Sequence, residues 1–236
     1  RAVSPTSRIV WFAATDGLFR LERATGSWQR IGEADGLPAA EVMSLAVAPG
    51  PDGVWAGTRR GLVFVPADGA PLSDPGRAMR RIHHVRASAD TLWISADDGL
   101  WILPLAEPDL APRRAPGSAH IPPLRTRVLD ARPAPGGVRA ITESGLYVED
   151  GGVWSGPVRA PALDAIGRPH SLATADGQLW VAGDLGVARL DTRSGLWTAY
   201  LVGQDIPLGP VHDVVPAGDD VWIATGAGAL RLRWRD

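Results

Sequence analysis

The sequence predicts an all-β protein, namely a six-bladed β-propeller built from four-stranded antiparallel blades. Three observations predict this fold class. A 12-residue unit occurs six times, successive copies start 38 to 46 residues apart, and no stretch shows the 3.6-residue period of an amphipathic helix. A four-stranded unit that repeats about every 40 residues is the signature of a propeller blade, and we expect residues 1–236 to form one domain of this kind.

Each 12-residue unit has the pattern of a strand, a tight turn and a second strand. Every copy begins with Val or Leu, has Gly at its eighth position and continues with an apolar residue. The copies are VWFAATDGLFRL (10–21), VWAGTRRGLVFV (54–65), LWISADDGLWIL (92–103), VRAITESGLYVE (138–149), LWVAGDLGVARL (179–190) and VWIATGAGALRL (221–232). Glycine adopts the positive φ of a hairpin turn without steric cost, so each copy predicts a β-hairpin.

The segments between the hairpins supply the remaining strands. A short apolar stretch precedes the hairpins, and these stretches predict the inner strands of the blades (42–49, 82–87, 128–133, 170–174 and 211–216). A stretch that contains Trp follows three of the hairpins and predicts outer strands (27–31, 153–157 and 196–201). Residues 104–127 contain six prolines, so we expect an irregular outer strand and a long surface loop there.

The two ends of the chain fit the same repeat. Residues 2–5 (AVSP) align with 213–216 (DVVP) and predict the inner strand of the first blade. After 231–236 (RLRWRD) no outer strand remains for the last blade. The last blade therefore either has three strands or is completed by a segment upstream of Arg1.

Composition excludes several classes of function. The sequence has no Cys, which excludes disulfides, thiol catalysis and Cys-ligated zinc, and all 24 basic residues are Arg, which excludes Schiff-base lysines and P-loops. The net charge of −2 gives no electrostatic footprint for nucleic acid. No apolar run is long enough to span a membrane, and no signal peptide is visible. We expect no nucleic-acid partner, no direct membrane insertion and no cofactor.

Two segments carry a family resemblance. Residues 24–65 and 189–232 share a TG/SG-x-W turn, a V-x-x-[LV] inner strand and a VW-x-[AG]-T hairpin, with a DGLP loop or a comparable one between them. These features resemble the two-component-regulator propeller repeat. The resemblance implies a sensor-type β-propeller outside the cytoplasm, in the periplasm or the extracellular space of a bacterium. It implies a role in ligand or protein recognition rather than catalysis.

The histidines are the main candidates for a binding site. When the inner strands are aligned by their distance from the hairpin, Met43, His83, Leu129, His170 and His212 share one position, and Ser44, His84, Asp130, Ser171 and Asp213 share the next. In a propeller the inner strands line a central channel, so these residues could meet near one mouth. We therefore predict a ligand-binding set that contains His83, His84, Asp130, His170, His212 and Asp213. We expect no bound metal, although imidazoles and carboxylates are ligands that divalent metals accept.

The hairpin turns are expected at the same mouth, and most of them carry acidic residues. Asp-Gly is ordinary turn chemistry, so these acids are interpreted as structural or solvated. Arg59 and Arg60 depart from this trend, and an arginine pair can hold a carboxylate or a phosphate. We add both residues to the predicted ligand-binding set.

The sequence therefore favours a non-catalytic module that recognises a small ligand or a protein. Nucleophile-elbow, HExxH and Gly-rich phosphate-loop motifs are absent, so we expect no enzyme activity. Two alternatives stay open. One is a scaffold subunit of a larger protein complex, and the other is a metal-dependent hydrolase or lyase that uses the His/Asp cluster at the channel mouth.

Overall fold

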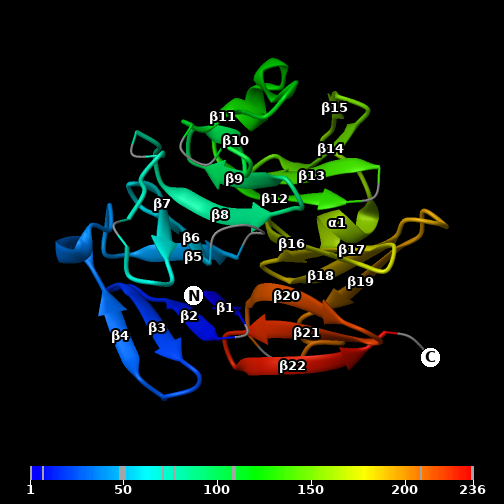
Figure 1. Ribbon diagram of the computed structural model, residues 1–236. Helices are drawn as coiled ribbons and strands as arrows, with labels where there is room; N and C mark the ends of the chain where they lie inside the picture. The colour runs from blue at the N-terminus through cyan, green and yellow to red at the C-terminus, as the bar shows by residue number, and fades with distance from the viewer. Residues whose placement is uncertain are drawn as a thin grey trace. The chain divides into compact units, whose positions relative to one another are not determined.

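A computed structural model gives the fold of the chain and describes residues 2–6, 8–47, 52–70, 72–76, 78–107, 110–134, 136–207 and 209–234. Within these residues the chain forms six small antiparallel sheets, one for each predicted blade, as Figure 1 shows. The protein is a six-bladed β-propeller, as the sequence predicts. The chain divides into two compact units, residues 1–128 and 129–236, and each is described separately below.

The first unit contains three blades. The first blade is β1 (Ala2–Pro5), β2 (Ile9–Ala13), β3 (Leu18–Glu22) and β4 (Trp28–Ile31), followed by a 3₁₀ turn, η1 (Glu33–Asp35). The second is β5 (Val42–Ala46), β6 (Gly53–Thr58) and β7 (Gly61–Pro66). The third is β8 (Ile82–Ala87), β9 (Thr91–Ala96), β10 (Gly99–Pro104) and β11 (Arg113–Arg114), followed by η2 (Ser118–His120) and η3 (Pro122–Arg125).

The second unit contains the other three blades; the first strand of its first blade begins at the boundary. The fourth blade is β12 (Val128–Ala134), β13 (Gly137–Thr142), β14 (Gly145–Asp150) and β15 (Val153–Ser155), followed by a short helix, α1 (Pro161–Ala165). The fifth is β16 (Pro169–Ala175), β17 (Gln178–Gly183), β18 (Gly186–Asp191) and β19 (Trp197–Leu201). The sixth is β20 (Val211–Ala217), β21 (Asp220–Thr225) and β22 (Gly228–Arg233).

The second blade differs from the predicted four strands, whereas the sixth has one of the two forms predicted for it. Among the described residues the second and sixth sheets each have three strands. In the second blade a single bridge between Phe64 and Ser73 occupies the position of the outer strand, because the segment after β7 contains no run of strand-forming residues. The third blade keeps a two-residue outer strand, β11, followed by loops, which confirms the irregular segment predicted for 104–127.

The hairpin glycines behave as predicted at five of the six positions. Gly17, Gly61, Gly99, Gly145 and Gly228 all have positive φ, between 127° and 155°. Gly186 is required for a different reason, since a Cβ atom there would lie 2.3 Å from the carbonyl oxygen of Tyr200. Five hairpins therefore need glycine for the conformation of the turn, and the sixth needs it for the close approach of β19.

Hydrophobic side chains fill the space between successive sheets of each unit. Trp11 and Trp180, both at the second position of the repeat, are fully buried in such clusters, and Trp55 is 2% exposed. Burial of one such aromatic side chain is worth on the order of 3 kcal/mol. The repeat therefore places its largest residues where blades pack against each other.

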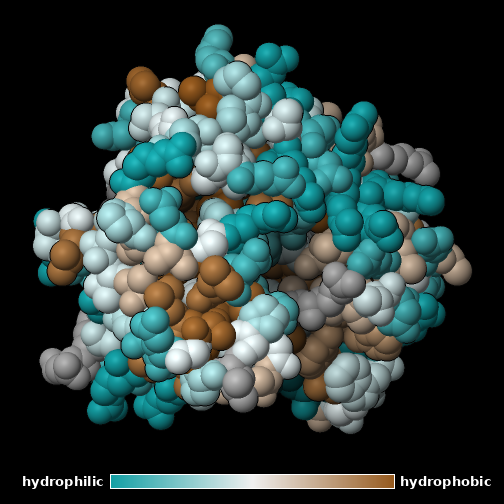
Figure 2. Space-filling model, turned by 180° about the vertical axis from the view of Figure 1, so that it is seen from behind, coloured by the Kyte–Doolittle hydropathy of each residue, from teal (hydrophilic) through white to brown (hydrophobic). Residues whose placement is uncertain are grey.

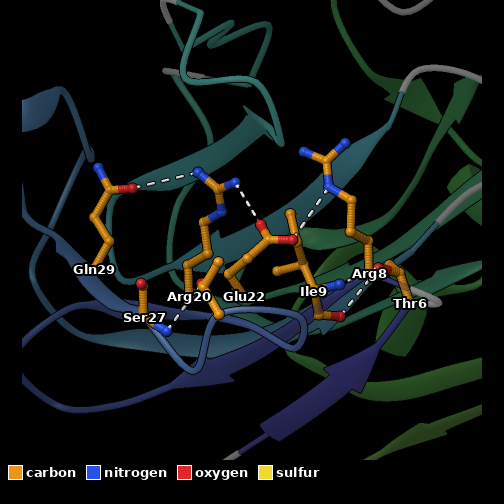
Figure 3. A network of polar contacts seen from close by, with 8 residues as sticks. Thr6, Arg8, Ile9, Arg20, Glu22, Ser27 and Gln29 are labelled. Atoms are coloured by element: carbon orange, nitrogen blue, oxygen red, sulfur yellow. Dashed lines mark hydrogen bonds and ion pairs between the residues drawn. The ribbon is translucent and has the colours of Figure 1, made fainter.

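A polar network joins residues of the first blade (Figure 3). Glu22 on β3 accepts a hydrogen bond from Arg20 at 3.2 Å and forms an ion pair with Arg8 at 3.5 Å. Arg20 also donates to Gln29 on β4 at 3.4 Å. These contacts are exposed or half-exposed, so they fix the arrangement of the strands more than they add stability.

Candidate functional site

The inner strands of four blades contain a β-bulge at the position that the histidines share. The strand register skips one residue between Val42 and Ser44, Ile82 and His84, Pro169 and Ser171, and Val211 and Asp213. The four skipped residues are Met43, His83, His170 and His212. A bulge leaves one residue outside the ladder and redirects its side chain. Three of the four bulges thus present an imidazole.

Each bulge lies beside the hairpin turn of its own blade. The backbone amide of Asp97 donates to the carbonyl of Arg81 at 2.9 Å, and in the fifth blade Asp184 donates to the carbonyl of Arg168 at 3.2 Å. Gly226 and Pro210 make the same contact in the sixth blade at 2.9 Å. The turn and the residue two places before the bulge are therefore joined, and together they form what we call the bulged end of each blade.

In the third blade the bulged end carries a compact polar cluster. His83 Nε2 lies 2.7 Å from Asp97 Oδ1, and the His83 side chain is only 9% exposed. Because a carboxylate only accepts hydrogen bonds, Nε2 carries the proton and donates it to Asp97. Arg127 Nε lies 3.5 Å from the same carboxylate oxygen and 3.4 Å from His83 Nε2. Since both nitrogens are donors in this arrangement, Arg127 pairs with Asp97 and not with the ring.

Burial keeps this histidine neutral. Burial lowers the pKa of His83 below its usual value, and the positive charges of Arg127 and Arg81 lower it further. The hydrogen bond and the charge of Asp97 oppose the decrease without cancelling it. His83 is therefore uncharged near pH 7, with Nε2 as the donor and Nδ1 as the acceptor.

Arg81 borders this cluster and has weak partners. Its Nη2 atom lies 3.9 Å from the sulfur of Met43, the residue at the bulge of the second blade. Its Nε atom is buried and has no hydrogen-bond partner among the described residues. Thioether sulfur is a weak acceptor, so the charge of this guanidinium is poorly compensated.

The fifth blade has the same residue types at the same positions but different contacts. Burial is the main cause that lowers the pKa of His170, and the charges of Asp184 and Asp213 and a hydrogen bond with the backbone of Val211 oppose it. His212, at the next bulge, is exposed and lowers the pKa of His170 slightly. Within the second unit His170, His212 and Asp213 are therefore electrostatic neighbours, as the alignment suggests.

The residues at the next aligned position connect neighbouring strands. Ser44 Oγ accepts a hydrogen bond from the amide of Val85 at 3.1 Å. Asp130 is fully buried, and its carboxylate accepts from the amides of Leu172 at 3.0 Å and of Ala131 at 2.9 Å. These contacts assign Asp130 to the junction between β12 and β16.

At this aligned position the side chain is less deeply buried in the sixth blade, where it is Asp213, and in the third blade, where it is His84. Ser171 Oγ donates to Asp213 Oδ1 at 2.6 Å, and that oxygen also accepts from the amide of Val214. His84 on β8 is half-buried opposite Ser95. The side chains of Asp213 and His84 lie next to the bulged ends of their blades and keep some solvent exposure.

Arg59 and Arg60 form the turn between β6 and β7, as predicted. Arg59 Nε pairs with Glu41 Oε2 at 3.1 Å, whereas the Arg60 side chain is exposed. With Thr15 and Glu33 they line an open depression of about 670 Å³. One of the two predicted anion ligands is thus already paired with a carboxylate of the chain.

Sequence reasoning missed a pattern of opposite charges around the position that the histidines share. The residue two places before the bulge position and the sixth residue of the repeat unit have opposite charges in four blades: Glu41 and Arg59, Arg81 and Asp97, Arg127 and Glu143, Arg168 and Asp184. Taken one by one, the turn acids are interpreted from the sequence as structural or solvated. Comparing them with the residues before the inner strands would have shown the pattern.

Within each unit, the described residues contain no group of three or more His, Asp or Glu side chains that could hold a metal ion. Of the helices in the described part of the chain, none has the length and apolar character needed to cross a membrane.

One face of the last sheet departs from the packing of the other blades. Trp222 is 45% exposed and Val215 is 53% exposed on this sheet, whereas Trp180 at the equivalent repeat position is fully buried. Figure 2 shows hydrophobic surface in its lower left part, where this sheet lies. The second position of the repeat is thus not a buried position in every blade.

No known protein-family profile matches the chain, and no curated protein sequence is significantly similar to it. Solved structures do resemble it. The extracellular domain of a hybrid two-component system of B. thetaiotaomicron gives a TM-score of 0.77 at 13% identity, over 100% of this chain and 32% of that one. A second such domain from B. thetaiotaomicron gives a TM-score of 0.69 at 16% identity, over 96% of this chain. The chain spans about a third of the length of these domains.

An enzyme also has a similar fold. A catalytically inactive histidine-to-alanine variant of virginiamycin B lyase from Staphylococcus aureus, solved with quinupristin, gives a TM-score of 0.70 at 14% identity. The match covers 97% of this chain and 78% of the lyase. At such identities the similarity establishes the propeller fold and leaves the function to be argued from the site.

Proposed function

We propose that this propeller is a non-catalytic recognition module of the extracytoplasmic sensor type, which binds its ligand at the bulged ends of the blades. The observation that carries the proposal is the set of bulges, which present His83, His170 and His212 beside the hairpin turns. Bulges commonly direct a side chain toward a binding site, and loops and turns on a rigid scaffold commonly carry recognition.

Two further facts support the proposal. The extracellular domains of two-component systems share the fold over nearly the whole chain, which is consistent with a location in the periplasm or the extracellular space. The contacts of His83 with Asp97 and Arg127 resemble a preorganised polar surface.

The test is a thermal-shift panel of amino acids, dicarboxylates, nucleotides, and mono- and disaccharides. Each stabilising compound is then measured by calorimetry with the wild type and with a variant that combines His83→Ala, His170→Ala and His212→Ala. Arg193→Ala is the matched control, since Arg193 lies in the turn between β18 and β19 at the other end of its blade. We expect the triple variant to lose binding and the control to retain it.

Binding that survives the triple variant would place the ligand elsewhere. If no compound in the panel stabilises the wild type, the result would favour the scaffold alternative. Trp222 and Val215 on the last sheet would then be the first residues to change.

A further inference from the structure

A cavity of about 280 Å³ in the first unit is lined by residues of the first and second blades. On the first blade, β3 supplies Arg20, and β4 supplies Gln29 and Ile31. The second blade supplies Val65 on β7 and Leu72 in the segment that follows. The volume is close to the lower limit for pockets that bind small molecules. The described lining includes no residue of a hairpin turn or a bulge, so this cavity is distinct from the bulged ends.

The apolar wall of the cavity includes the segment that replaces the outer strand of the second blade. This segment is joined to β7 by the single bridge between Phe64 and Ser73, and Leu72 lies directly before that bridge. Ile31 is 7% exposed and Val65 is 1% exposed, and Leu72 packs against the same hydrophobic cluster. An aliphatic group of a ligand would lose water-accessible apolar surface against this wall, which favours binding.

The polar wall of the cavity presents hydrogen-bond donors. Arg20 Nη2 donates to Glu22 at 3.2 Å, and Arg20 Nη1 donates to Gln29 Oε1 at 3.4 Å (Figure 3). A guanidinium carries five N–H donors, so these two contacts leave further N–H groups on Arg20. Because Gln29 Oε1 accepts from Arg20, the orientation of this amide is set and Nε2 is its donor group. The wall is therefore suited to a group that accepts hydrogen bonds.

Two guanidiniums share one carboxylate beside the cavity. Glu22 Oε2 accepts from Arg20, and Glu22 Oε1 lies 3.5 Å from Arg8 Nε, so both arginines point toward Glu22 in Figure 3. The Arg20 side chain is 18% exposed and the Arg8 side chain is 54% exposed, so water solvates Arg20 less well. A poorly solvated cation that shares its counter-charge favours an anion from outside the chain.

An acidic residue limits how much negative charge the cavity accepts. Asp35 belongs to the lining, and its Oδ2 atom accepts a hydrogen bond from the amide of Gly32 at 2.8 Å. The charge of Asp35 would repel a second negative group on a ligand. The cavity therefore favours a single anionic group over two.

We propose that this cavity binds a small aliphatic monocarboxylate. Arg20 and Gln29 hold the carboxylate, because the fork of an arginine matches the geometry of carboxylate oxygens. The aliphatic chain packs against Ile31, Val65 and Leu72. This site goes beyond the proposed function, since it uses no residue of the bulged ends.

The experiment uses hexanoate as the probe, titrated by calorimetry against the intact chain at low ionic strength. We expect saturable binding of hexanoate, and binding of 1-hexanol, succinate and phosphate that is at least about tenfold weaker. Arg20→Gln should weaken hexanoate binding by at least about tenfold. Arg8→Gln is the matched control, because it removes the other guanidinium on Glu22 and does not line the cavity. This control should change the affinity by less than about twofold.

A second variant keeps the test independent of the partly buried Arg20. Ala70 is an exposed residue of the lining, so Ala70→Glu leaves the core intact and adds a negative charge at the cavity. It should also weaken hexanoate binding by at least about tenfold. Thermal unfolding checks that each variant is folded.

Four results would overturn the site. They are absence of saturable hexanoate binding, equal binding of hexanoate and 1-hexanol, binding that Ala70→Glu leaves unchanged, and equal weakening by Arg20→Gln and Arg8→Gln. The last of these would indicate a general effect of charge. The variant without the three bulge histidines should bind hexanoate as the wild type does, so this proposal and the proposed function fail separately.

Discussion

The third and fifth blades carry the same residue types at the same positions, and their contacts differ. In the third blade His83 donates to Asp97 at 2.7 Å, whereas His170 in the fifth blade hydrogen bonds with the backbone of Val211. The difference comes from the next element along the chain. Arg127 reaches Asp97 in the first unit, and the strand that begins at Val211 supplies a backbone group in the second unit.

The comparison shows that a repeated motif fixes the backbone position of a residue but not the contacts of its side chain. Both histidines are bulge residues, and burial lowers the pKa of both. Of these two blades, the third adds a half-buried arginine and a charged hydrogen bond to its bulge. Specific chemistry in a repeat protein therefore depends on the few residues in which one repeat differs from the next.

The largest expected effect concerns the residues that hold the inner strands of these two blades. Asp130→Ala removes the acceptor of two amides next to β16, and each buried amide left unsatisfied costs about 1–3 kcal/mol, so we expect a total loss of about 3 kcal/mol. Ser44→Ala removes one neutral acceptor next to β8 and should cost about 1 kcal/mol. Urea unfolding measures both losses. Equal losses would show that the carboxylate holds its strand no better than the hydroxyl does.

A smaller effect distinguishes the two turn acids. Asp97→Asn removes the charged acceptor of His83, and it should reduce the free energy of unfolding by about 1 kcal/mol, because the pair is partly exposed. The pKa of His83 should fall further, since both contributions of Asp97 raise it. Asp184→Asn should change stability by less than about 0.5 kcal/mol, the usual range for a surface substitution. If Asp184→Asn costs as much as Asp97→Asn, the two bulged ends do not differ as described.

The pH dependence of stability tests what the two blades share. The pKa values of His83 and His170 are lowered in the folded state, so between the folded and unfolded pKa values the unfolded chain binds more protons. Stability from these residues is therefore fully present above the unfolded pKa of about 6.5, and it decreases as the pH falls through the folded values. Unfolding between pH 7.5 and 5.5 should show this decrease, and His83→Gln and His170→Gln should each remove part of it. A wild type that becomes more stable over this range would contradict both assignments.

The smallest effect separates the two histidines. Arg127→Gln removes a positive charge that lowers the pKa of His83, so that pKa should rise. The pKa of His170 should stay unchanged, since Arg127 is not among the groups that shift it. NMR titration of the ring signals measures both values in one sample. A parallel shift of the two would indicate a general change of the protein and not a local one.

Much of the fold was predictable because it repeats. Six copies of a hairpin with glycine at one position predicted six sheets. The outer strand of the second blade was not predictable, since a single bridge at Ser73 leaves no periodic pattern. Trp222 shows a further limit, because the repeat alone does not reveal which copies of a buried position stay exposed.

For the candidate site, the sequence by itself determined which residues share a position, and it aligned His83 with His170 and His212. Only the tertiary structure decided that this position is a bulge, that Asp130 is buried between strands, and that the buried Arg81 Nε has no hydrogen-bond partner among the described residues. The physical reason is that alignment depends on spacing along one strand. Strand register, burial and charge compensation depend on neighbours that lie far away in the chain and meet only when the blades pack.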